Sequence, residues 1–173
     1  GGSEGDIKES SIKDFLEDVI AVYDFFVKVQ GVDTENIIII GASFGSYLGA
    51  VLSSKRKISS LVLRVPANYR DEDFEKPLHG ARNTPEHSEW KQRVLDNQAT
   101  KGLRAVNHFE GPVLIVESEN DELVPSSVIQ SYLDAVGNKQ ALSHVIMQGA
   151  THSLSKDEPR QREYTEIVLN WLK

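Results

Sequence analysis

Residues 36–46, NIIIIGASFGS, constrain the fold of this chain more than any other stretch. Four β-branched residues in a row, Ile37 to Ile40, indicate a strand. Because the run has no polar side, its pattern is typical of a central strand that a parallel sheet buries on both faces. The glycine-containing turn that follows is expected to lead into a helix, so the stretch predicts a strand, a turn and a helix of an α/β domain.

The turn itself fits the pattern G-x-S-x-G, with Ser43 at its centre. Such a turn holds a serine on strained backbone at the tip of a strand, and Gly41 and Gly45 are expected to let strand and helix approach closely. The amide of Phe44 is expected to point toward charge that develops on a bound carbonyl. A phosphate-binding loop is disfavoured because neither a Lys-Ser/Thr pair nor G-x-G-x-x-G is present. A five-residue pattern of this kind also arises by chance. The predicted strand before it favours the interpretation as a nucleophile turn.

Apolar periodicity and turn residues predict the other elements. The first helix is expected to begin at the N-cap Ser11 and to end at Gly31. Further helices are expected after Ser43 and over residues 85–96, 101–108, 128–136 and 160–172, with strands over 37–40, 58–65, 113–116 and 142–147. This alternation predicts an α/β domain with a mostly parallel sheet flanked by helices.

The chain has 173 residues, which suits a single domain spanning residues 1–173. Between Ala67 and His108 apolar residues become sparse and charged residues more frequent. A long connection of this kind is typical of a lid over a site or of a mobile loop, and we expect a lid-like insertion over residues 67–108.

Charge and composition exclude several kinds of partner. Lys and Arg number 19 against 26 Asp and Glu, a net charge of −7 without a basic cluster, so nucleic acid and anionic membrane are poor candidates. The sequence has no cysteine, which excludes disulfides and thiolate metal sites. Neither a signal peptide nor an apolar run of roughly 18 residues is visible, and we expect a cytoplasmic protein.

Three of the four predicted strands end near a residue type that acyl transfer needs. Ser43 follows the first strand, Asp121 the third and His152 the fourth. Because the carboxyl ends of parallel strands lie at the same edge of a sheet, these residues are expected to converge. An imidazole can take the proton of a serine, and a carboxylate can orient the imidazole. The order Ser, Asp, His is the order expected with a nucleophile elbow.

Other candidates for these roles are weaker. Three carboxylates compete with Asp121 as loop charges, and its position before Val124-Pro125 favours Asp121; the competitors are Glu117, Glu119 and Glu122. The remaining histidines lack neighbours with catalytic or metal-ligand spacing, and we interpret them as structural or exposed: His79, His87, His108 and His144.

Three segments resemble the α/β-hydrolase superfamily, specifically small serine hydrolases related to serine aminopeptidases, acyl-CoA thioesterases and dienelactone hydrolases. They are Gly41 to Gly45, Asp121-x-x-Val124-Pro125 and Gly149-Ala150-Thr151-His152. The resemblance implies a three-layer fold and a serine hydrolase that cleaves an ester, thioester or amide of a small-molecule acyl substrate. It assigns Ser43 as nucleophile, His152 as general base, Asp121 as its orienter and the Phe44 amide to the oxyanion hole. It implies no metal and no organic cofactor.

The first residues, Gly1-Gly2-Ser3-Glu4-Gly5, resemble the end of the turn that follows the fourth strand of that family. This match implies that the chain holds only strands five to eight, the C-terminal half of the fold. The family's second oxyanion donor, from the loop after the third strand, would then be absent. The strand at 37–40 would become an exposed apolar edge, so we expect self-association through it.

Two alternatives accompany this interpretation. Arg64, near the end of the second strand, is expected either to bind a carboxylate or phosphate of the substrate or to form a structural ion pair. The chain itself is either a serine hydrolase or, in the other reading, a catalytically impaired hydrolase-fold fragment or a non-enzymatic binding module.

Overall fold

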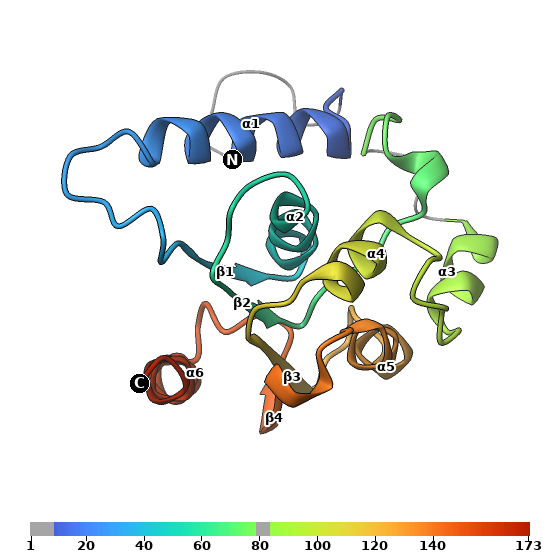
Figure 1. Ribbon diagram of the computed structural model, residues 1–173. Coiled ribbons are helices and arrows are strands. Elements are labelled where there is room, and N and C mark those ends of the chain that lie inside the picture. The colour runs from blue at the N-terminus through green and yellow to red at the C-terminus, as the bar shows by residue number, and fades with distance from the viewer. Residues whose placement is uncertain (1–8, 79–83) are drawn as a thin grey trace.

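The computed structural model describes residues 9–78 and 84–173 (Figure 1). The Gly1 to Gly5 segment and His79 lie outside the described residues. In chain order the helices and strands are α1 (Ile12–Phe26), β1 (Ile38–Ala42), α2 (Phe44–Ser53), β2 (Ser60–Arg64), α3 (Pro85–Lys91), α4 (Lys101–His108), β3 (Val113–Asn120), α5 (Ser126–Ala135), β4 (Leu142–Thr151) and α6 (Glu158–Trp171). Short 3₁₀ helices span Asp71–Asp73 and Lys139–Ala141.

The four strands form one parallel sheet in the order β1-β2-β3-β4. Helices connect successive strands, because parallel neighbours need a crossover between them. The register pairs Ile39 with Leu61 across β1 and β2, and Leu63 with Ile115 across β2 and β3. The parallel sheet and the flanking helices confirm the α/β class expected from the alternation of elements.

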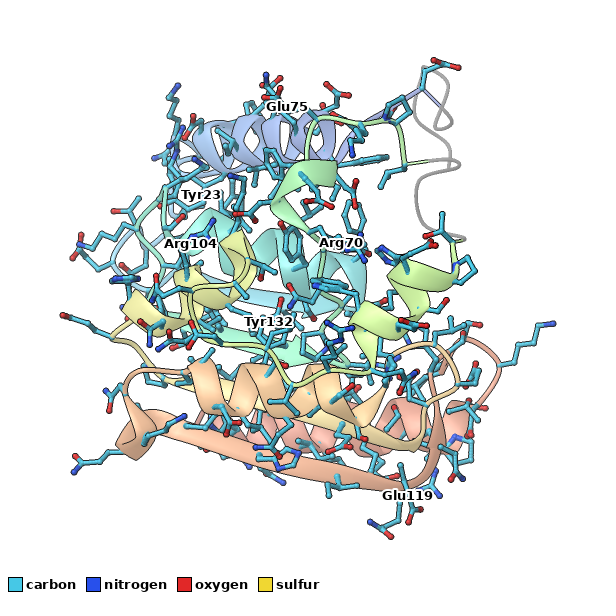
Figure 2. All side chains as sticks on the ribbon, turned by 90° about the vertical axis from the view of Figure 1, so that its right-hand side faces the viewer. Tyr23, Arg70, Glu75, Arg104, Glu119 and Tyr132 are labelled. Carbon is cyan, nitrogen blue, oxygen red and sulfur yellow. The ribbon has the colours of Figure 1, made fainter. Side chains whose placement is uncertain are left out.

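Helices cover both faces of the sheet, which makes three layers (Figure 1). Alternate residues of a strand point to opposite faces. Leu61 and Leu63 therefore pack with residues of α2, α4 and α5, including the fully buried Tyr132 at the centre of Figure 2. Val62 packs with Val168 of α6 on the other face. α1 lies beyond α2 and contacts it rather than the sheet (Figure 1).

α1 begins where expected and ends early. The Ser11 hydroxyl accepts a hydrogen bond from the Asp14 amide, and the Asp14 carboxylate accepts one from the Ser11 amide, which closes a capping box. The helix ends at Phe26, and Gly31 lies in the following turn with φ of +91°. The predicted end at Gly31 was therefore wrong. The apolar face expected from the periodicity is also only partly covered, since Phe26 is 47% exposed.

β1 is an edge strand among the strands that the structure describes. Ile38 and Ile40 are 38% and 55% exposed, so burial on both faces, which the local pattern favoured, was wrong. The edge position implied by the family resemblance is the one observed. Ile39 points the other way and packs on Gly49, where a Cβ atom would lie 2.6 Å from the Ile39 Cγ2 atom.

Part of the predicted insertion belongs to the core. α4 has the bounds expected, and Leu103 and Val106 on it are fully buried against the sheet. α3 ends at Lys91 rather than Asp96. The lid-like role of the remainder, residues 67–100, stays a prediction. No helix in the described ranges is long and apolar enough to cross a membrane.

Candidate active site

Ser43 stands between β1 and α2 on strained backbone. Its φ of 51° and ψ of −114° are unfavourable for a residue with a side chain, and such conformations persist where surrounding contacts enforce them. The Ser43 amide donates to the Arg64 carbonyl over 2.9 Å, and the Ser43 carbonyl accepts from the Ala67 amide over 3.2 Å. These bonds hold the turn against the end of β2.

The two glycines that flank Ser43 differ in what they contribute. A Cβ atom on Gly41 would lie 2.6 Å from the Gly45 carbonyl oxygen and 2.7 Å from the Ser46 nitrogen. At Gly45 a Cβ atom would meet nothing within 4 Å. The expected close approach therefore requires glycine at position 41, and the same expectation for position 45 was wrong.

This difference predicts opposite effects of two alanine substitutions. Gly41→Ala is expected to lower the free energy of unfolding by about 3 kcal/mol or more, because backbone atoms cannot yield to the new methyl group. Gly45→Ala is expected to leave it unchanged or to raise it by up to about 1 kcal/mol, since alanine favours the helix. Urea denaturation followed by circular dichroism measures both. Equal effects of the two substitutions would contradict a steric constraint at Gly41 that is absent at Gly45.

His152 and Asp121 form the hydrogen-bonded pair that the sequence predicted. The His152 Nδ1 atom lies 2.8 Å from Asp121 Oδ2 and 3.0 Å from Oδ1. The side chains are 13% and 6% exposed, which protects the pair from water. The Asp121 Oδ1 atom also accepts hydrogen bonds from the amides of Leu123 and Val124 over 2.8 and 2.7 Å. Asp121 is thus fixed by its own loop and orients the imidazole.

Two further carboxylates hold the loop that carries His152. Glu119 accepts a hydrogen bond from the Gly149 amide over 2.6 Å, and Glu122 accepts one from the His152 amide over 3.2 Å. Glu119 lies at the edge of the molecule near the end of β4 (Figure 2). Sequence reasoning weighed both only as competitors for the role of Asp121. Their bonds span 30 residues, and no local pattern indicates them.

Arg64, the last residue of β2, is only 6% exposed. Its guanidinium donates to the Ser118 hydroxyl over 3.0 Å and to the His152 carbonyl oxygen, and it lies over the Tyr164 ring. Burial lowers the pKa of Arg64 from its ordinary value, and the nearby Tyr164 and Asp121 oppose this. These contacts favour a positioning role over the expected ion pair; binding of a substrate anion by Arg64 stays a prediction.

The Phe44 amide occupies the first position of α2, where helix geometry supplies no acceptor. The amides of Ser46 and Tyr47 donate back to the Ser43 carbonyl instead. The role of the Phe44 amide in an oxyanion hole stays a prediction. In the described part of the chain no hydrogen bond joins the Ser43 side chain to His152. Such bonds are often long before substrate binds.

The other described histidines have partners outside this pair. His144 lies 2.9 Å from Glu117, and the His108 Nδ1 atom lies 2.8 Å from the Arg104 carbonyl oxygen. His87 is buried beside Trp90. These surroundings fit the structural or exposed roles expected from the sequence.

Two hollows differ in their relation to the candidate site. One of about 160 Å³ lies at the carboxyl end of β3 and is lined by Asp121, Ser118 and Val65 among others. A groove of about 580 Å³ lies between α1, α2 and α4, and its lining includes Val51 of α2 and Lys55, which follows the C-terminus of that helix. Ser43 precedes the N-terminus of α2, so this groove is at the wrong end of the helix to receive a reacting carbonyl.

The geometry contains the groups that acyl transfer needs. A serine on a strained turn, an imidazole oriented by a buried carboxylate, and a helix amide beside the serine lie at the carboxyl ends of β1, β3 and β4. A hydroxyl nucleophile, a base with an orienter and an oxyanion donor together are suited to attack on a carbonyl carbon.

Comparison with known proteins agrees with this chemistry. The model of the prolyl oligopeptidase family matches residues 5–173. No curated protein matches the chain.

Solved structures with the same fold include three hydrolases. An α/β serine hydrolase homologue from Coxiella burnetii has a TM-score of 0.66 and 21% identity, over 100% of this chain and 64% of that one. Est1E from Butyrivibrio proteoclasticus, solved with ferulic acid bound, has a TM-score of 0.70 and 23% identity, over 99% and 73%. The Paleococcus ferrophilus monoacylglycerol lipase has a TM-score of 0.68 and 14% identity, over 99% and 79%. At these levels of sequence identity, the similarity shows a shared fold and no more.

Proposed function

Because the chain belongs to the prolyl oligopeptidase family, we propose that it is a serine hydrolase that cleaves an ester, thioester or amide through a Ser43–His152–Asp121 triad. The chain has the α/β-hydrolase fold, and it spans 64% of the Coxiella burnetii hydrolase homologue. The observation that carries the proposal is the buried Asp121–His152 pair, at the carboxyl end of the same sheet as a serine on strained backbone.

The reaction begins with attack of the Ser43 oxygen on the substrate carbonyl. The His152 Nε2 atom takes the serine proton, while Asp121 holds the Nδ1 proton and stabilises the imidazolium. The Phe44 amide donates to the oxyanion of the tetrahedral intermediate. The intermediate collapses as His152 protonates the leaving alcohol, thiol or amine, which leaves an acyl group on Ser43. Water, deprotonated by His152, then releases the acid and regenerates the serine.

Covalent labelling tests the nucleophile. A fluorophosphonate probe is expected to label wild-type protein at Ser43, because the probe reacts with activated serines; Ser43→Ala is expected to abolish labelling. Intact-protein and peptide mass spectrometry measure the adduct. Ser53→Ala is the matched control and should label like wild type, because Ser53 lies at the far end of α2, where its hydroxyl donates to the Ala50 carbonyl over 2.7 Å. Labelling that survives Ser43→Ala would contradict the proposal.

A catalytically impaired fragment or a binding module remains the second candidate, and two observations favour it. The Ser43 side chain is not hydrogen bonded to His152 in the described part of the chain, and Phe44 supplies the one oxyanion donor identified there. Loss of a single donor lowers kcat by about 10²- to 10³-fold in a serine protease. Labelling of Ser43 without turnover of any activated ester would favour this candidate over the hydrolase.

A further inference from the structure

Arg64 contacts both halves of the proposed site. Its carbonyl oxygen accepts the Ser43 amide over 2.9 Å and the Ser46 hydroxyl over 3.0 Å, so its backbone holds the nucleophile turn. Its guanidinium donates to the His152 carbonyl oxygen and to the Ser118 hydroxyl. One residue therefore links the loop of the nucleophile to the loop of the base.

The acceptors of this guanidinium are neutral. In the described part of the chain Arg64 takes part in no ion pair; its guanidinium contacts a hydroxyl, a carbonyl oxygen and the face of the Tyr164 ring, and the Asp121 carboxylate acts on it only from beyond ion-pair distance. Burial of a cation without a paired carboxylate is unfavourable, and an apolar residue of similar size would serve stability at least as well. Stability alone therefore does not account for an arginine here.

The backbone is also strained at the residue that follows Arg64. Val65 is fully buried and has a φ of +39°, which is costly for a β-branched residue. Its amide donates to the Val116 carbonyl over 2.8 Å, which holds it in place. Strained backbone of this kind clusters at functional sites. The strain lies between the carbonyl of Arg64, which binds the nucleophile turn, and the Ala67 amide, which binds the Ser43 carbonyl.

We propose that Arg64 is a positioning residue that fixes the His152 loop relative to Ser43. The inference rests on the proposed function, since positioning matters only if His152 serves Ser43. The His152 peptide is held on one side by Arg64 at its carbonyl and on the other by Glu122 at its amide, while Asp121 holds the ring. Without the guanidinium the loop loses one of these three supports, and the imidazole shifts from the path of the serine proton.

Kinetics of Arg64→Met test the proposal. The variant is expected to react with the fluorophosphonate probe about 100-fold more slowly, because a displacement of about 1 Å in a catalytic group costs about that much. With an activated aryl ester kcat should fall and KM should stay within about threefold, since a positioning residue acts through His152 and not on the substrate. Arg64→Lys, which keeps the charge and reaches one acceptor, should restore part of the rate, and Ser118→Ala should cause a smaller loss.

Arg56→Met is the matched control, because Arg56 pairs with Asp24 away from the site. Rates are normalised to the folded fraction, measured by urea denaturation. The proposal would be overturned if Arg64→Met, after this normalisation, were labelled at a rate within twofold of wild type. Arg64 would then be a structural residue only.

A readout without catalysis separates this inference from the proposed function. The His152 Nδ1 proton, hydrogen bonded to Asp121, is expected to give a downfield proton NMR signal in wild type, absent from His152→Ala. Loss or broadening of this signal in Arg64→Met, with retention in Arg56→Met, supports positioning even if wild type fails to label. An unchanged signal in Arg64→Met would contradict positioning, whereas failure of wild type to label would contradict the proposed hydrolase alone.

Discussion

Asp121→Asn is expected to lower kcat for an activated ester by about 10⁴-fold, because it leaves His152 in the wrong tautomer. In the wild type, Asp121 Oδ1 accepts hydrogen bonds from the Leu123 and Val124 amides. These amides still need an acceptor in the variant, so the amide oxygen of the asparagine must take the Oδ1 position. Its NH₂ group then takes the place of Oδ2, 2.8 Å from His152 Nδ1, and donates to it. The imidazole therefore carries its proton on Nε2 and cannot accept one from Ser43.

The measurement combines steady-state kinetics with a stability control. Asp134→Asn makes the same chemical change on α5, where the carboxylate accepts a hydrogen bond from Gln130, and should keep wild-type kcat. Urea denaturation of both variants shows whether the loss reflects unfolding. A kcat for Asp121→Asn within tenfold of wild type, in folded protein, would exclude Asp121 as the residue that orients His152.

The protein is expected to self-associate at micromolar concentration through the edge of β1, and Ile38→Lys with Ile40→Lys is expected to make it monomeric. Both isoleucines are exposed on a strand that has no neighbour on one side among the described strands. Such an edge offers unpaired backbone groups and apolar side chains to a second copy of the chain, while edge lysines oppose pairing because their charges would be buried.

Sedimentation velocity and light scattering measure the mass of both proteins. Leu169→Lys on α6, a residue 56% exposed, is the matched control and should leave the association unchanged. A wild-type protein that is monomeric at micromolar concentration would contradict self-association. An equal response to Leu169→Lys would place the contact elsewhere than at β1.

Features that depend on neighbouring residues in the chain were predicted best. The Ser11 N-cap, the bounds of α4 and the turn around Ser43 all follow from side chains within a few residues of one another. The pairing of Asp121 with His152 was also predicted, although 31 residues separate them, because strands of a parallel sheet end at a common edge.

Features that depend on contacts between distant segments were missed or wrong. The hydrogen bonds of Arg64 to Ser118 and His152 span 54 and 88 residues, and the structural ion pair that was one of two expectations for Arg64 does not occur among the described residues. Glu119 and Glu122 were weighed only as alternatives to Asp121, whereas they hold the loop of His152. A hydrogen bond from a backbone amide to a carboxylate cannot be recognised from the sequence, because every residue except proline supplies such an amide.

The sequence by itself determined the nucleophile turn, because a run of β-branched residues followed by glycine and serine permits few backbone conformations. It also determined the α/β class and predicted the pairing of Asp121 with His152. Only the tertiary structure decided that Gly41 and not Gly45 is under steric constraint, that β1 lies at an edge, and that Arg64 ties the two loops together. These depend on which atoms meet across the sheet, and packing between segments far apart in the chain sets those distances.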